Sequence, residues 1–271
     1  MKLTSTTLLL ISSCAMVMPL SAAIVFSNNY EDNNVAPEVG SVTVGNGSIT
    51  TVETDSGNQG TAMGTYVGLY DQNATSPVNF TLNLTTTAAI TGGNSVSLDF
   101  DIAARRTSGS TKTFFVDALD SNGDIVMQLV LGDAGAYGNG GSDRQRPGYG
   151  TLSGGNSLLP GPGTPGSFWW GADSTTASFN PNLTSHFSLS IDSDGFDLTT
   201  TSQGGTVYST TGLPTYDSTS SFTDIVAFEF TSAGNNAGIY LDNLVVETVP
   251  EPSSAALLGL GGLALILRRR K

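Results

Sequence analysis

Alternation of apolar and polar residues is the feature that most constrains what this chain can fold into. Between residues 95 and 103 every second residue is apolar: Val96, Leu98, Phe100 and Ile102. Residues 77–84 repeat this pattern. A period of two places the apolar side chains on one face of a β-strand. No stretch of useful length has the period of an amphipathic helix, so the sequence predicts an all-β protein.

The alternating segments recur with turn residues roughly every 8 to 12 positions, as in a β-sandwich. Strands are expected over residues 41–44, 48–52, 77–84, 95–103, 113–119, 125–131, 186–191, 196–201, 207–209, 224–231 and 238–247. In the strand at 224–231 we expect Val226, Phe228 and Phe230 to point inward. The prediction is a single two-sheet antiparallel β-sandwich, jelly-roll-like, over residues 24–248, with a long Gly- and Pro-rich loop at 132–166.

Charge excludes several classes of partner. Residues 24–249 contain 22 of the 23 Asp and Glu residues and 5 of the 10 Lys and Arg residues, which gives a formal net charge of −17. Nucleic acids and anionic lipids require basic surfaces, so neither is expected as a partner of this part of the chain. The acidic composition is typical of an extracellular protein that takes up divalent cations.

The first 23 residues have the pattern of a signal peptide. Lys2 precedes an apolar stretch, and Ser21-Ala22-Ala23 offers small residues for cleavage. The mature chain is therefore expected to begin near Ile24. An alternative interpretation makes Cys14 a lipidated residue. If the first interpretation holds, the mature protein contains no cysteine, and no disulfide is available to it.

The C-terminal residues 249–271 form a second targeting segment. Pro250-Glu251-Pro252 precedes an apolar run at 255–267, and a basic cluster follows: Arg268, Arg269, Arg270 and Lys271. As a helix the run would span about 20 Å, which is short for a bilayer core of about 30 Å. The basic cluster is expected to stay on the cytoplasmic side. A plain membrane anchor is the alternative interpretation.

This order of three features resembles the PEP-CTERM sorting signal of bacterial surface proteins. The resemblance implies a transient insertion in the inner membrane and processing by an exosortase-type enzyme. It further implies delivery to the cell surface or extracellular matrix of a Gram-negative-type bacterium that makes exopolysaccharide.

Few residues offer catalytic chemistry. His186 is the one histidine, and it alternates outward with Ser188 and Ser190, so a surface role is favoured over a catalytic base. Asp99 and Asp101 lie on the polar face of one predicted strand. A pair of carboxylates is what a glycosidase needs, but outward acids are also normal on a solvated face.

Metal binding is possible at three places. The turns Asp120–Asp124 and Asp192–Asp197 gather oxygen ligands around a glycine, although ordinary Asx turns explain both. In the last predicted strand, Asp242 shares its parity with apolar neighbours, and a buried acid must be paired or bind a cation. The aromatic-Glu pattern at Tyr30-Glu31 and the Tyr-x-Asp-Asn pattern at 240–243 resemble carbohydrate-binding-module-type and concanavalin-like jelly rolls. That resemblance implies a structural Ca²⁺ held by Glu31 and Asp242.

Aromatic residues beside the long loop suggest a surface for sugars. Trp169, Trp170 and Tyr149 could stack on sugar rings, although core packing is the alternative. The leading hypothesis is a non-enzymatic structural or adhesive protein of the cell surface or matrix. The alternatives are a carbohydrate-binding module that recognises exopolysaccharide and a sandwich-fold glycoside hydrolase or lyase.

Overall fold

The computed structural model describes residues 22–30, 36–45, 49–53, 65–71, 77–105, 113–132, 146–159, 185–202, 205, 207–233 and 237–250. Residues Ala22–Glu251 form one compact unit. The regular elements of the described residues are strands, and none of these residues belongs to a helix that could cross a membrane. The expected signal helix and the expected C-terminal helix lie outside the described residues.

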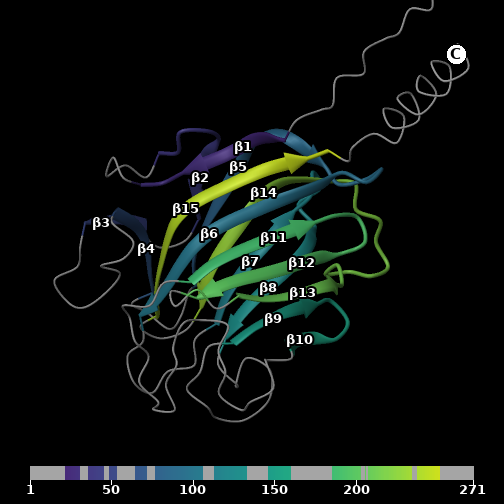
Figure 1. Ribbon diagram of the computed structural model, residues 1–271. Helices are drawn as coiled ribbons and strands as arrows, with labels where there is room; N and C mark the ends of the chain where they lie inside the picture. The colour runs from purple at the N-terminus through teal and green to yellow at the C-terminus, as the bar shows by residue number, and fades with distance from the viewer. Residues whose placement is uncertain are drawn as a thin grey trace, which may run out of the picture. The chain divides into compact units, whose positions relative to one another are not determined.

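The strands form two sheets, and within each sheet all neighbouring strands are antiparallel (Figure 1). The first sheet has the order β13-β12-β11-β6-β15-β4-β3, and β1 also pairs with β15. Its strands are β13 (Val207–Leu213), β12 (Phe196–Ser202), β11 (Ser185–Ile191), β6 (Ser95–Arg105), β15 (Ala237–Val249), β4 (Thr65–Asp71), β3 (Ile49–Glu53) and β1 (Ala23–Asn28).

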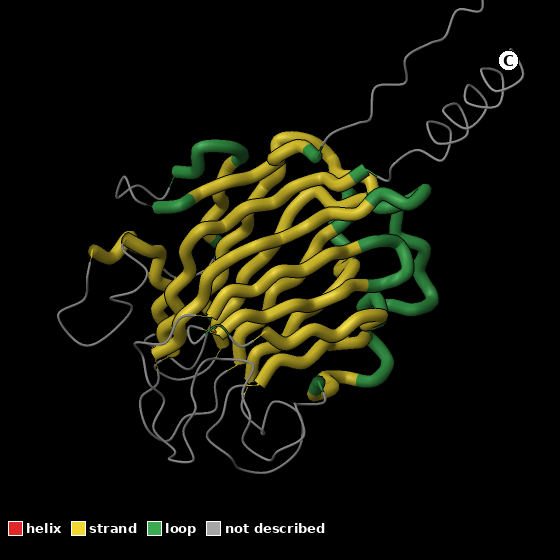
Figure 2. The backbone as a smooth tube through the Cα atoms, viewed as in Figure 1, coloured by secondary structure: helices red, strands yellow, loops and turns green. Residues whose placement is uncertain are grey.

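The second sheet has the order β10-β9-β8-β7-β14-β5-β2. Its strands are β10 (Gly155–Leu158), β9 (Arg146–Thr151), β8 (Ile125–Gly132), β7 (Thr113–Leu119), β14 (Asp224–Ala233), β5 (Val78–Ala89) and β2 (Ser41–Val44). Figure 2 shows the strands of the two sheets running across the unit, with turns gathered at one end. The expected two-sheet antiparallel β-sandwich is confirmed.

Aromatic side chains from both sheets fill the space between them. Phe100 of the first sheet stacks on Phe187 with ring centroids 5.4 Å apart, and its ring meets Phe230 of the second sheet edge-on at 5.6 Å. Phe230 also stacks on Phe80 at 5.1 Å. All four rings are fully buried, and burying one phenylalanine contributes about 1.5–3 kcal/mol. The alternating apolar residues therefore supply the core that holds the sheets together.

Two local expectations are corrected by the structure. Phe228 and Phe230 point inward as expected, but Ile225 rather than Val226 belongs to the core, because the register shifts between Ile225 and Ala227. Part of the expected loop at 132–166 is a hairpin, formed by β9 and β10. Glycines in these strands hide the alternation: Gly150 lies so close to Gln128 that a Cβ atom there would overlap its side chain.

Candidate functional site

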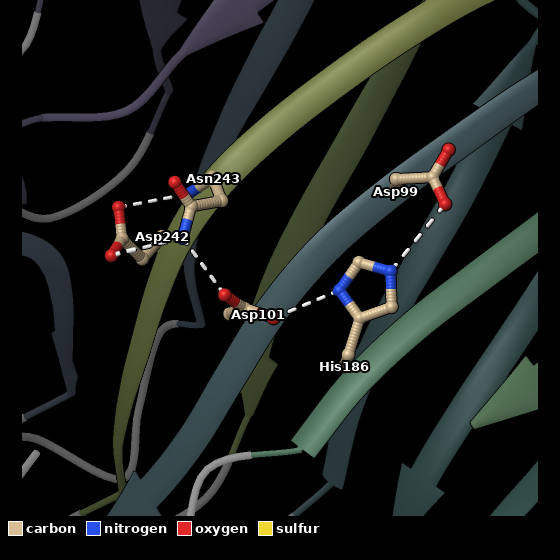
Figure 3. Close-up of polar contacts among 5 residues, drawn as sticks. All are labelled: Asp99, Asp101, His186, Asp242 and Asn243. Carbon is tan, nitrogen blue, oxygen red and sulfur yellow. Dashed lines mark hydrogen bonds and ion pairs between the residues drawn. The ribbon is translucent and has the colours of Figure 1, made fainter. Parts of the chain in front are cut away.

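Three neighbouring strands of the first sheet bring polar residues together on its outer face (Figure 3). Asp99 and Asp101 lie on β6, and the core residues Phe100 and Ile102 alternate with them. His186 lies on β11 directly opposite Asp101. The three side chains are partly exposed: 32% for Asp99, 27% for Asp101 and 44% for His186. The expectation that all three point outward is met.

A β-bulge in β15 adds Asp242 and Asn243 to this group. Asp242 is opposite Asp101, but Val245 is opposite Asp99, so β15 has one extra residue here. Asn243 takes up the bulge with a φ of 51°, a left-handed conformation that asparagine tolerates better than most residues. On the other edge of β15, pairing with β4 ends at Leu241 and pairing with β1 begins at Leu244, so the bulge lies between two partner strands.

The bulge also separates Asp242 from the apolar residues that follow it. Counting by two from the sequence places Asp242 on the same face as Leu244 and Val246. In the structure Leu241, Leu244 and Val246 are core residues, and the extra residue at 243 shifts the parity between them. Asp242 is nevertheless buried, with 1% exposure. The sequence also suggested burial, but from a shared parity with Leu244 and Val246 that the bulge removes.

These side chains form a continuous chain of polar contacts. The backbone N–H of Asn243 donates to Asp242 Oδ1 at 2.7 Å, and Asn243 Nδ2 donates to Asp101 Oδ2 at 2.8 Å. Asp101 Oδ1 lies 2.8 Å from His186 Nδ1. His186 Nε2 then lies 3.6 Å from Asp99 Oδ1. Figure 3 shows the five residues in this order across β15, β6 and β11.

The two aspartates keep His186 charged. Its hydrogen bonds to Asp101 and then Asp99 raise the pKa of His186 to about 9, against the opposing effect of burial. Burial raises the pKa of Asp99. Hydrogen bonds from His186, Ser188 and Ser97 outweigh burial, so the pKa of Asp99 is lowered overall. At neutral pH the histidine is therefore an imidazolium between two carboxylates. It has no free nitrogen to act as a general base.

Tyr30 brings the N-terminal part of the chain close to Asp242. The backbone N–H of Tyr30 donates to Asn28 Oδ1 at 2.9 Å, and the tyrosine is 1% exposed. The pKa of Tyr30 is raised, first by burial and then by the negative charges of Asp242 and Glu38. The phenol is therefore neutral at any physiological pH.

The expected calcium ligands, Glu31 and Asp242, are not tested by the structure. Asp242 is buried beside Tyr30, which precedes Glu31 in the chain, but Glu31 lies outside the described residues. Among the residues that are described, no group of three or more His, Cys, Asp or Glu side chains could hold a metal ion. Calcium takes six to eight oxygen ligands, so a site at Asp242 would need Glu31 and further oxygens. Calcium binding stays a prediction.

The two Asp-rich turns have a role that does not involve metal. Asp120 Oδ1 accepts from the backbone N–H groups of Asn122 and Asp124. Asp192 Oδ1 accepts from those of Asp194 and Gly195. These bonds are the Asx-turn bonds that the sequence suggested, and they account for both aspartates.

The other expected site residues are less informative. Tyr149 of β9 is partly buried against the core, which gives its ring a packing role. Trp169 and Trp170 lie outside the described residues, as do Glu251, Pro252, Arg268, Arg269 and Arg270 of the sorting tail, whereas Pro250 is the last residue described.

One further polar group lies on the outer face of the second sheet, and the sequence reasoning did not find it. Asp117 of β7 is only 8% exposed and accepts from Gln128 Nε2 at 2.9 Å. Glu229 of β14 is directly opposite Asp117. Burial raises the pKa of Asp117 to about 7; the Glu229 charge adds to this, and the Gln128 hydrogen bond opposes it. An acid between apolar residues at 114–119 was the available signal.

Comparison with known proteins gives a sequence match at the C-terminus and a structural match over the body. The PEP-CTERM protein-sorting motif matches residues 248–271. No curated protein matches the chain. The sandwich resembles a carbohydrate esterase from the Shiga toxin-encoding bacteriophage phi24B, with 11% identity and a TM-score of 0.55, over 84% of this chain and 99% of the esterase.

A second solved structure has the same fold. It is a lectin from Bauhinia forficata in complex with GalNAc, at 11% identity and a TM-score of 0.50, over 84% of this chain and 99% of the lectin. At such low identity the likeness concerns the fold alone. The chain therefore has a lectin-like β-sandwich body and ends in a PEP-CTERM protein-sorting motif, as its sequence predicted.

Proposed function

We propose that this is an exported, non-enzymatic adhesive protein whose sandwich binds a polysaccharide at the bacterial cell surface or in its matrix. Export follows from the sorting motif at 248–271. Processing by an exosortase-type enzyme in the inner membrane of a Gram-negative-type bacterium is the finer part of the proposal. A lectin that binds GalNAc and a carbohydrate esterase with this fold support a carbohydrate as the ligand.

The observation that carries the proposal is the chain of polar contacts from Asn243 through Asp101 and His186 to Asp99. Sugar hydroxyls both donate and accept hydrogen bonds, and this surface offers carboxylate oxygens beside an amide and an imidazolium. The internal contacts fix these side chains before a ligand arrives, so little conformational entropy is lost on binding. The charged histidine and the ionised Asp99 also make the group a poor acid–base catalyst, which favours binding over turnover.

A second candidate function has one observation in its favour. Asp117, with a pKa of about 7, is opposite Glu229 on the next strand, and after burial the Glu229 charge contributes to that raised pKa. Retaining glycosidases use a protonated carboxyl and a carboxylate about 5–5.5 Å apart. The 8% exposure of Asp117 gives a substrate little access, so binding by the first sheet is ranked first.

Affinity electrophoresis through gels that contain a galactan, a glucan or a mannan tests the proposal. We expect at least one polysaccharide to retard the protein, and Asp99→Ala or His186→Ala to weaken binding roughly tenfold or more, as for lost hydrogen bonds to charged groups. Thr81→Ala, on the outer face of the second sheet, is the matched control and should bind as the wild type does. The proposal fails if no polysaccharide retards the protein, or if Thr81→Ala weakens binding as much as the other two.

The same polysaccharides separate the second candidate from the first. Release of reducing ends that is lost in Glu229→Gln, with binding intact, would show an enzyme on the second sheet. Binding without any release supports the adhesive function.

A further inference from the structure

Strand pairing fixes the end of the sandwich from which the C-terminal segment leaves. Val249, the last residue of β15, is paired with Ser95 of β6, and Thr248 is paired with both Val96 of β6 and Ala23 of β1. The sorting motif starts at residue 248, inside the strand. No flexible linker therefore separates the fold from the motif. The first strand, β1, also begins at this end.

The distance from this end to the apolar run is short. Residues 250–254 separate Val249 from the run that begins at Ala255. Five residues span at most about 18 Å when fully extended, and Pro250 and Pro252 favour extension. An apolar run inside a membrane therefore holds the end of β15 within that distance of the hydrocarbon core.

The turns at this end, which we name the exit end, are residues 90–94, 120–124, 152–154, 192–195 and 214–224. Backbone hydrogen bonds join them: Ile90 donates to Thr223 O and Ser193 donates to Ile90 O, both at 3.0 Å. These turns contain six aspartates and no lysine or arginine. The aspartates are Asp120, Asp124, Asp192, Asp194, Asp217 and Asp224. The charged side chains of these turns thus all have the same sign.

We propose that the exit end faces the lipid headgroups while the apolar run is inserted, and that its aspartates keep it away from anionic lipid. The reach of about 18 Å is roughly twice the Debye length of about 8 Å at physiological ionic strength. The sandwich can therefore stay more than a Debye length from an anionic membrane surface while the apolar run remains inserted. A body with a net charge of −17 then leaves the membrane once the tail is cut. This inference rests on the tail insertion in the proposed function.

The test uses the chain from Ala22 to Lys271, which contains no natural cysteine. A fluorophore is attached at Ser221→Cys, an exposed position at the exit end, or at Val207→Cys, which is 57% exposed. Val207 is paired with Thr201, five residues and about 17 Å from the exit end at Phe196. Vesicles contain phosphatidylcholine alone or with a minority of phosphatidylglycerol, and a quencher is attached to some headgroups.

We expect the chain to float with both kinds of vesicle and the probe at 221 to be quenched severalfold more than the probe at 207. Phosphatidylglycerol should reduce quenching at 221, and 1 M salt, with a Debye length of about 3 Å, should restore it. The double variant Asp124→Asn, Asp194→Asn should respond less to phosphatidylglycerol. Both residues are exposed, and neither carboxylate accepts a hydrogen bond in the described part of the structure.

Two results would overturn the inference and leave the proposed function intact. Equal quenching at the two positions would mean that the sandwich lies on its side. Quenching at 221 that changes with neither phosphatidylglycerol nor salt would mean that the aspartates do not set the distance between the exit end and the headgroups. A chain that does not float with either kind of vesicle would instead overturn tail insertion, and with it both this inference and the membrane-processing part of the proposed function.

Discussion

At the scale of single residues, two ionisable groups make stability depend on pH in different windows. The pKa of His186 is raised from 6.5 to about 9, so the folded state binds its proton more tightly than the unfolded state does. This stabilisation is present below pH 6.5 and is lost as the pH rises through about 9. Because the side chain is 44% exposed, solvent screening limits the effect to the order of 1 kcal/mol.

His186→Gln should therefore remove the fall in the free energy of unfolding between pH 6.5 and 9. Urea unfolding at several pH values measures it. The control is Asp117→Asn. The raised pKa of Asp117, about 7 against 3.8, favours the folded state below pH 4, and this contribution is lost as the pH rises to 7.

Asp117→Asn should remove only that lower window and should stabilise the protein at pH 8 by at most about 4 kcal/mol. The assignment would be wrong if His186→Gln removed the pH dependence of the free energy of unfolding between pH 4 and 7. It would also be wrong if Asp117→Asn removed the pH dependence between pH 6.5 and 9.

At the scale of elements, the bulge in β15 positions the outer-face group. Asn243 combines a left-handed φ of 51° with an Nδ2 hydrogen bond to Asp101. Asn243→Gly keeps the conformation and loses the bond, so its cost should stay near 1 kcal/mol. Asn243→Val also forces a β-branched residue into this region, and its cost should exceed that of the glycine variant by about 1–2 kcal/mol.

Urea unfolding compares the two variants with Glu247→Val, an outward position of β15 where φ is negative. Valine suits a strand, so this control should change stability by less than about 0.5 kcal/mol. Equal costs for valine at 243 and 247 would show that the bulge conformation is not strained.

The same element shows how far the sequence could predict the structure. Alternation identified most strands and the outward direction of Asp99, Asp101 and His186, because a period of two follows directly from strand geometry. It could not show an extra residue at Asn243, since a bulge depends on the partner strand. It also missed β1 and β4, as well as β9 and β10, where glycines and Pro147 replace the alternating residues.

At the scale of the whole molecule, pairings between distant segments create the candidate site. Asp101 and Asp242 are 141 positions apart in the sequence and become opposite residues only because β15 inserts between β6 and β1. Local sequence patterns contain no information on such pairings. The candidate residues could therefore be proposed one at a time, but their grouping could not. The N-terminal segment reaches the same region through Tyr30, because burial and then the charge of Asp242 raise the pKa of its phenol.

This meeting of the first and last strands of the sandwich leads to a last prediction, on calcium. A cation held by Asp242 and Glu31 would tie the N-terminal segment to the last strand, so its binding should stabilise the folded unit. At a calcium concentration of 100 times the Kd, mass action adds about 2.7 kcal/mol. For a unit of this size, that corresponds to a rise in Tm of roughly 5–10 °C.

Thermal unfolding in calcium and in EDTA measures this rise, which Asp242→Asn and Glu31→Gln should each abolish. Asp101→Asn is the matched control, because it removes a neighbouring carboxylate that the calcium hypothesis does not use. If Asp101→Asn abolishes the rise as well, the cation is bound by the outer-face group instead. If wild-type protein unfolds at one temperature in both solutions, the hydrogen bonds from Asn243 are sufficient to stabilise the buried carboxylate without a metal ion.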